Sequence, residues 1–274
     1  SSKKQFWIEH SSQAVWVLAQ PATTRLRYRA KADTGAVYGA YSHDAASDWN
    51  TVSVTNRNVT SFVMGGYSHL ADNASSSNNS VVLDNSESMY VYGGLNNNMN
   101  EGSKTVAHNN TVTLKNGNSA MYVFGGAGEF ANGNTINIQD STVTAAIFAG
   151  TGTSGEDNNT VSISGKSVLN NAVIFGGMLH KTGNTLQMHT SGVTAGDIAN
   201  FENLHFYLPN NIANGDTVLT LDGQAFGTPT DITGANIGVA VTGGKAALQP
   251  GDRITLINAE LGLTADAKPV NNTS

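Results

Sequence analysis

One motif recurs six times along the middle of the chain, and this repeat constrains the fold more than any other feature. An Asn followed by Thr or Ser, and then by alternating apolar and polar residues, begins at Asn50, Asn79, Asn110, Asn134, Asn159 and Asn184. Successive starts lie 24 to 31 residues apart. This period is too short for two helices with their turns, and it fits one coil of a parallel β-helix with two or three short strands.

Alternation within the repeat indicates strands. In the first start block, Val52 and Val54 would face one way while Thr51 and Ser53 face the other, as in a half-buried strand. A second block, which ends in Gly-Gly or Ala-Gly, follows each of the first five starts, at residues 62–66, 90–94, 122–126, 146–150 and 173–177. Each period therefore predicts two short strands, the second of which ends at a glycine.

Stacking explains why such a chain needs several coils. One coil cannot bury its inward residues alone, whereas coils stacked about 4.8 Å apart bury a continuous apolar column. The repeated Asn predicts a ladder of side-chain amides, each bonded to the equivalent amide of the next coil. The sequence thus predicts an all-β protein, a right-handed parallel β-helix (solenoid) of about six to eight coils with a C-terminal capping segment.

The repeat also divides the chain into segments. We expect an N-terminal cap or unassigned segment at residues 1–35 and the β-helix repeats at residues 36–200. The C-terminal coils and the capping segment would occupy residues 201–260, and residues 261–274 would form a linker.

Composition excludes other classes of protein. The chain contains no cysteine, which excludes disulfides, thiol catalysis and Cys-ligated zinc. Its formal net charge is −6, which argues against a nucleic-acid partner because such proteins carry a basic surface. It shows no signal peptide and no apolar run of about 18 residues, so we interpret it as a mature or excised fragment.

Catalytic and metal-binding motifs give no strong candidate. The sequence lacks Gly-Asp-Ser-Gly, Gly-x-Ser-x-Gly and His-Glu-x-x-His, and its 7 histidines are scattered. We therefore expect a protein that is not an enzyme, with no catalytic residue, no cofactor and no metal site. The enzymatic alternative is a polysaccharide-cleaving β-helix, in which Glu129 and Asp157 would converge from loops of nearby coils. We interpret both as solvated loop charges.

Aromatic residues precede most of the glycine pairs and carry the main binding hypothesis. Tyr92 and Phe124 lie directly before a pair, and Val91 and Val123 must point opposite to them in a strand. If the valines face inward, an aromatic ladder runs along the outside, where an apolar stripe marks an interaction surface. The alternative is favoured, in which the aromatic residues face inward or are covered by a loop or by the N-terminal segment, because aromatic stacks are common in β-helix cores.

The candidate binding residues combine this aromatic column with the longest loops. Those loops span residues 67–79 and 95–110 and leave the rod on one side, where binding residues concentrate. The candidates are Tyr67, His69, Leu95, Met99, Tyr92, Phe124 and Phe130.

The repeat dissolves after Thr185, and the tail of the chain carries a family resemblance. Residues 200–209 read Asn-Phe-Glu-Asn-Leu-His-Phe-Tyr-Leu-Pro, and residues 248–257 read Leu-Gln-Pro-Gly-Asp-Arg-Ile-Thr-Leu-Ile. Together with the Asn-Thr-Val repeats, this tail resembles the passenger domain of Gram-negative autotransporters (type V secretion) over roughly residues 36–260. In that family a β-helix stalk ends in a folding and capping segment, which an outer-membrane β-barrel follows.

The resemblance implies a location and a function. We expect a non-catalytic adhesin at the bacterial cell surface or outside the cell, exported via the periplasm, whose side loops bind a host cell-surface protein or glycan. It would bind no nucleic acid and would meet the outer membrane only through a barrel domain outside this chain. Two alternatives stay open. One is self-association between passengers, through an outer face of Asn, Thr and Ser, in aggregation or biofilm; the other is the polysaccharide-cleaving enzyme.

Overall fold

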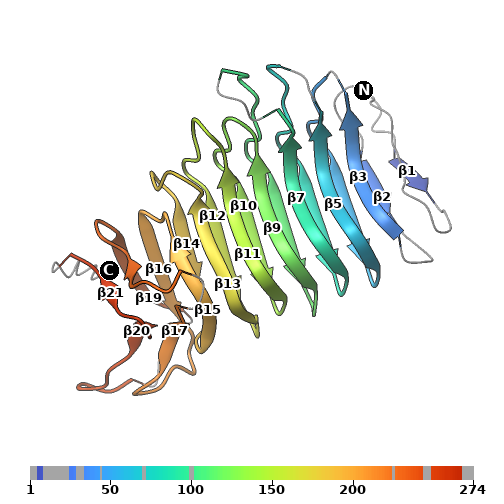
Figure 1. Cartoon of the computed structure of the whole chain (residues 1–274). Coiled ribbons are helices and arrows are strands. Elements are labelled where there is room, and N and C mark those ends of the chain that lie inside the picture. Colours follow the sequence, from blue (N-terminus) through green and yellow to red (C-terminus); the bar gives the residue numbers. More distant parts are fainter. Residues whose placement is uncertain are drawn as a thin grey trace.

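The computed structural model describes residues 5–8, 25–28, 34–43, 45–69, 72–98, 102–223, 226–242 and 248–266. These residues form 21 strands and contain no helix. All pairings between the strands are parallel, within one 10-stranded, one 9-stranded and one 2-stranded sheet. The two large sheets stack as a parallel β-helix of about seven turns (Figure 1), which confirms the predicted fold class.

Each coil contributes one strand to each large sheet. The 10-stranded sheet has the order β1 (Gln5–Ile8), β2 (Arg25–Tyr28), β4 (Thr51–Thr55), β6 (Ser80–Asp84), β8 (Thr111–Lys115), β10 (Thr135–Gln139), β12 (Thr160–Ser164), β14 (Thr185–Met188), β16 (Asn203–Leu208) and β19 (Asn236–Val241). The 9-stranded sheet has the order β3 (Thr34–Ser42), β5 (Asn58–Ser68), β7 (Glu87–Asn96), β9 (Ser119–Ala127), β11 (Thr142–Thr151), β13 (Leu169–Gly177), β15 (Val193–Ala199), β17 (Thr217–Leu221) and β20 (Thr255–Ala259).

The tail of the chain continues both sheets beyond the last Asn repeat. Strands β16 and β19 extend the 10-stranded sheet, while β17 and β20 extend the 9-stranded sheet. The 2-stranded sheet pairs β18 (Thr230–Asp231) with β21 (Leu263–Thr264) at this end of the rod.

The core is an apolar column between the two large sheets. As the alternation predicted, Val52 and Val54 of β4 are buried, whereas Thr51 and Ser53 are only partly covered. The same pattern recurs in β6, β8, β10, β12 and β14. Each fully buried Val, Leu or Ile contributes roughly 1.5–3 kcal/mol to the stability of the fold, so the stacked column dominates its energetics.

The repeated Asn forms the predicted amide ladder inside one corner of the rod. The side-chain oxygen of Asn79 accepts hydrogen bonds from the backbone nitrogen of Asn50 at 2.8 Å and from its Nδ2 at 2.9 Å. The same pair of bonds joins Asn79 to Asn110 and continues, coil by coil, to Asn184. These buried polar groups are therefore satisfied, as a low-dielectric interior requires.

The glycine at the end of each second block makes room for this ladder. A Cβ at Gly94 would overlap the carbonyl oxygen of Ser76 and approach Nδ2 of Asn110 to 2.8 Å. Any larger residue would push the loop and the amide ladder apart. The last glycine of the block is therefore a packing requirement of the corner, which explains why it recurs in each of these five coils.

Candidate functional site

The aromatic column lies on the outer face of the 9-stranded sheet. Val63, Val91, Val123, Ile147 and Ile174 are all 0 % exposed and point into the core. Because neighbouring residues of a strand point to opposite faces, the aromatic residues that follow them emerge on the outside. The favoured expectation of an inward aromatic column is therefore wrong.

The interior leaves no room for rings at this wall. Gly93 is the next inward position after Val91, and a Cβ there would lie 2.7 Å from Cβ of Asn110. Beside the Asn ladder, this inward position accepts only glycine or, at residue 149, alanine. The small space at this end of the strand thus disfavours an inward row of rings, whereas the core accepts the ring of Phe206 on β16 of the other large sheet.

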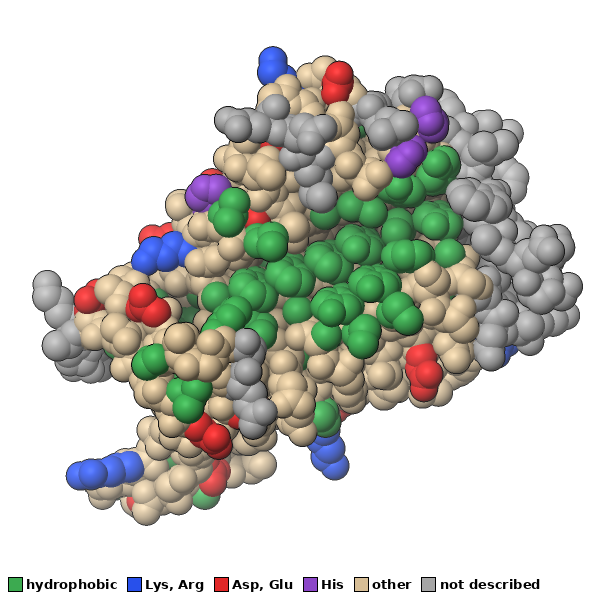
Figure 2. Space-filling model, in the orientation of Figure 1, with side chains coloured by type: hydrophobic (Ala, Val, Ile, Leu, Met, Phe, Trp, Pro, Cys, Tyr) green, Lys and Arg blue, Asp and Glu red, His purple; other side chains and the backbone are tan. Residues whose placement is uncertain are grey.

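These rings form two stacked rows, which we call the aromatic stripe. In the first row, neighbouring ring centroids are 4.4, 5.0 and 4.7 Å apart and ring planes differ by at most 7°, through Tyr92, Phe124, Phe148 and Phe175. In the second row the centroids are 5.3 and 5.2 Å apart, through Phe62, Tyr90 and Tyr122. Figure 2 shows this stripe as a continuous band of hydrophobic side chains, with no charged side chain within it.

The stripe is half-buried and stays uncharged. Its rings are partly exposed, and the more exposed Met89 and Met121 flank the second row. Burial, with a smaller effect of the neighbouring Tyr90, raises the pKa of Tyr92 to about 12. Tyr92 is therefore neutral at any physiological pH. A contiguous exposed apolar patch on a protein surface often marks an interaction site.

The structure divides the predicted binding residues among three places. Tyr92 and Phe124 lie in the stripe. Tyr67 and Leu95 are partners in register between β5 and β7, and the Tyr67 hydroxyl lies 2.9 Å from Nδ1 of His69. These three side chains form a cluster near the N-terminal end of the stripe, with Tyr38 stacked on Tyr67 at 6.2 Å.

Two predicted residues do not join either group. Phe130 lies in the loop that follows β9. Its backbone forms isolated parallel β-bridges with Val106 and Gly155. It is half-buried against Gly155 and thus serves the packing of that wall. Met99 lies outside the described residues.

The loop carboxylate Glu129 is buried and bonded, so the expectation of a solvated charge is wrong for this residue. Only 4 % of Glu129 is exposed. Its carboxylate accepts hydrogen bonds from the backbone nitrogens of Gly102 and Lys104 and from the hydroxyls of Ser103 and Ser154. The bond from Gly102 is the main cause that holds the pKa of Glu129 below its usual value, against the opposing effect of desolvation.

A second buried carboxylate was not singled out from the sequence. Glu156 is 0 % exposed and accepts bonds from the backbone nitrogens of Gly152, Leu179 and His180 at 2.7, 2.5 and 3.0 Å. Both carboxylates therefore fasten loops to the rod. Within the ranges that the structure describes, no group of three or more His, Cys, Asp or Glu side chains is placed to hold a metal ion.

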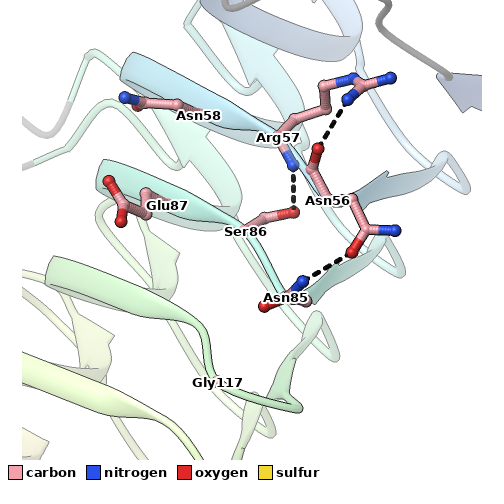
Figure 3. A pocket seen from close by; sticks show the side chains of 7 residues that line it. All are labelled: Asn56, Arg57, Asn58, Asn85, Ser86, Glu87 and Gly117. Atoms are coloured by element: carbon pink, nitrogen blue, oxygen red, sulfur yellow. Dashed lines mark hydrogen bonds between the residues drawn. The ribbon is translucent and has the colours of Figure 1, made fainter.

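A polar groove lies at the border of the 9-stranded sheet opposite to the Asn ladder. At this border each coil turns from the 10-stranded sheet into the 9-stranded sheet. Figure 3 shows its polar part, of about 360 Å³, lined by Asn56, Arg57, Asn58, Asn85, Ser86, Glu87 and Gly117. A second depression of about 370 Å³ shares Asn58 and Glu87 and extends toward the stripe past Thr60, Met89, Ser119, Met121 and Thr144. We call the two together the corner groove. Sequence reasoning missed it entirely.

The turn geometry that shapes this groove does leave a sequence signal. Asn56, Asn85 and Asn116 occupy equivalent corner positions with positive φ angles of 54°, 47° and 61°. This left-handed conformation favours Asn and Gly over other residues. The third corner holds one residue more than the second, and Gly117 occupies the widened turn with a φ of 86°.

Comparisons with family models, with curated proteins and with solved structures find no match to this chain. Across the described ranges, no helix has the length and hydropathy needed to span a membrane.

Proposed function

We propose that the chain is a non-catalytic binding rod of the adhesin type, displayed on a bacterial surface or secreted, which docks on a protein receptor through the aromatic stripe. The single observation that carries this proposal is the outward orientation of seven stacked rings on an uncharged face. Aromatic residues and Met are enriched in the buried centres of protein interfaces, where they supply most of the binding energy.

The stacking favours a protein over a sugar as the partner of the stripe. A sugar ring packs against the face of an aromatic ring. In the first row, planes within 7° and centroids 4.4 to 5.0 Å apart mean that each inner ring covers its neighbour's face. The stripe thus presents ring edges to solvent, and edges suit flat apolar contact with protein side chains.

The autotransporter resemblance supports the surface location. A β-helix whose strands continue past the last repeat is the architecture expected of such a passenger. Of the two carboxylates considered for the enzymatic alternative, Glu129 and Asp157, Glu129 is held by four donors within the loops, which makes it a poor free acid or base.

The test compares variants of the aromatic stripe on the 9-stranded sheet with a variant on the outer face of the 10-stranded sheet. Phe124→Ser with Phe148→Ser removes the middle of the stripe, and Tyr207→Ser removes an outward ring on β16, which stacks on His189 at 4.3 Å. Binding of the purified chain to cultured epithelial cells should fall about tenfold or more for the stripe variant. It should be unchanged for Tyr207→Ser and should disappear when surface proteins are removed by protease. Equal binding by the stripe variant and the parent chain would refute the proposal.

Self-association is the second candidate function, and the regular pitch of the stripe favours it. A second copy presents the same rows at the same spacing, so two rods can pack their faces as paired sheets do in steric zippers. Sedimentation over a range of concentrations separates the candidates. A dimer that Phe124→Ser with Phe148→Ser abolishes would assign the stripe to self-association instead of receptor binding.

A further inference from the structure

The corner groove is a site distinct from the stripe, and its lining points to a ligand of different chemistry. Each of its two connected parts, of about 360 and 370 Å³, falls within the range of roughly 300–1,000 Å³ seen for small-ligand sites. The groove runs along the rod, because it takes one rim residue from each of three successive strands, Asn58, Glu87 and Ser119, which are partners in register. An extended ligand would therefore lie parallel to the rod axis.

The polar wall of the groove offers planar hydrogen-bonding groups. Asn58 and Glu87 point the same way from adjacent coils (Figure 3). Nδ2 of Asn85 donates to Oδ1 of Asn56 at 2.7 Å, which orients both amides. Among the described residues, no bond uses Nδ2 of Asn56 or Oδ1 of Asn85, so one donor and one acceptor remain for a ligand.

Arg57 adds a donor that its own surroundings do not satisfy. Its Nη1 donates to the backbone carbonyl of Asn56 at 2.8 Å, which folds the guanidinium over the turn. Its Nε is buried and finds no hydrogen-bond partner among the described residues. Because a buried atom cannot contact a ligand, the guanidinium would bind through Nη2, which no hydrogen bond uses among the described residues (Figure 3).

The other wall of the groove is apolar. Met89 and Met121 are 45 % and 43 % exposed, and the buried Val59 and Ala120 lie beneath them. Thioether side chains adapt to irregular apolar surfaces. A polar rim of amides, guanidinium and carboxylate beside an apolar wall matches a pyranose, which carries hydroxyls at its edge and C–H groups on its faces.

Charge narrows the class of sugar. Arg57 and Glu87 are the charged residues of the lining, so the groove is neutral as a whole, while the chain carries a net charge of −6. A sulfated or uronic-acid polymer would find no net positive charge in the lining. We propose that the corner groove binds a neutral oligosaccharide, which extends along the rod with about one sugar for each coil rise of roughly 4.8 Å. This site goes beyond the docking function and does not depend on the stripe.

The experiment uses an array of immobilised oligosaccharides with neutral, carboxylated and sulfated members, followed by calorimetry with the neutral tetrasaccharide that binds best. Asn58→Ala with Glu87→Ala should weaken this binding about tenfold or more, as should Arg57→Leu. Arg57→Lys should bind the tetrasaccharide nearly as weakly as Arg57→Leu, because lysine lacks the planar guanidinium fork. The matched control is Lys166→Ala, which removes an exposed cation at the same corner of a coil outside the groove.

The outcomes separate this proposal from the docking function. The proposal predicts binding to neutral oligosaccharides that is insensitive to salt. This binding should be lost in the groove variants and retained in Lys166→Ala and in Phe124→Ser with Phe148→Ser. Thermal unfolding of each variant checks that the rod is intact. Binding confined to charged members, neutral binding that survives the groove variants, or no binding to the array would each overturn the proposal, whatever the stripe variants do to cell binding.

Discussion

The side-chain oxygen of Asn134 accepts two hydrogen bonds from Asn110, one from its backbone nitrogen at 2.9 Å and one from its Nδ2 at 3.1 Å. Both residues are 0 % exposed. One amide therefore satisfies two buried donors of the neighbouring coil and, through its own Nδ2, donates to Asn159. At this corner, one side chain thus satisfies the buried donors that join two coils.

Asn134→Ala should lower the free energy of unfolding by about 3 kcal/mol or more, because each orphaned buried polar group costs roughly 1–3 kcal/mol. Asn137→Ala removes an outward amide of the same strand, β10, and should change it by less than about 0.5 kcal/mol. Urea denaturation of the two variants measures the difference. Equal effects would show that the ladder does not hold the coils together.

The orientation of β11 can be tested with two adjacent residues. Ile147 is 0 % exposed, whereas Phe148 lies in the stripe. Ile147→Ala should cost about 2–5 kcal/mol of stability. Phe148→Ala should cost less, since it loses the stacking contacts with Phe124 and Phe175, worth about 0.5–1.5 kcal/mol each. If Phe148→Ala proved the more damaging, the ring would belong to the core.

Glu129 should make the loop at residues 102–105 sensitive to acid. Its pKa is lowered in the folded chain, chiefly by the bond from the Gly102 nitrogen, so its contribution to stability is complete above the unfolded pKa of about 4.3. That contribution is lost as the pH falls through the lower, folded pKa. The protection factors of the Gly102 and Lys104 amides, which correct for the slower intrinsic exchange in acid, should therefore fall over this acidic range.

Glu129→Gln should accelerate the same exchange at neutral pH and remove the acid-induced step. Asp157→Asn, at a half-exposed carboxylate of the next coil, is the control and should leave exchange at Gly102 and Lys104 unchanged. An acid-induced step that persists in Glu129→Gln would assign it to another group.

Tyr92 should be among the last tyrosines to ionise. Burial raises its pKa to about 12, whereas an unperturbed tyrosine titrates near 10. The stability linked to this shift is fully present below about pH 10 and is lost as the pH rises through about 12. Tyrosine ring resonances followed by NMR should show a late signal that Tyr92→Phe removes, in addition to those of Tyr38 and Tyr67, whose pKa values burial also raises. Titration of Tyr92 near pH 10 would contradict the half-buried position.

The sequence predicts the walls of the rod better than its surfaces. The start Asn and the alternation of Val52 with Ser53 identify strands, because both follow from backbone geometry that repeats once per coil. The same alternation requires that Val123 and Phe124 point opposite ways, but it does not tell which of them faces the core. That choice depends on the space inside the rod, and Gly93 marks a position where this space accepts no ring.

The corner groove and the buried carboxylates were beyond prediction for another reason. Asn58, Glu87 and Ser119 become neighbours only when the register between coils is known, and the coils differ in length. Glu129 is buried because loop nitrogens from residues 102 and 104 converge on it, and such contacts carry no periodic pattern. The left-handed Asn corners and the extra Gly117 are the signals that a reader of the sequence would use.

The Asn ladder also bears on how such a rod changes over evolutionary time. Each coil contacts only the coil before it and the coil after it, and every ladder junction uses the same side chain. Duplication or deletion of one whole period, such as residues 110–133, would leave an equivalent Asn-to-Asn junction at the new boundary. The length of the rod and the chemistry of its surface can therefore be inherited separately. The length changes by whole coils, and the surface changes by substitution of outward residues.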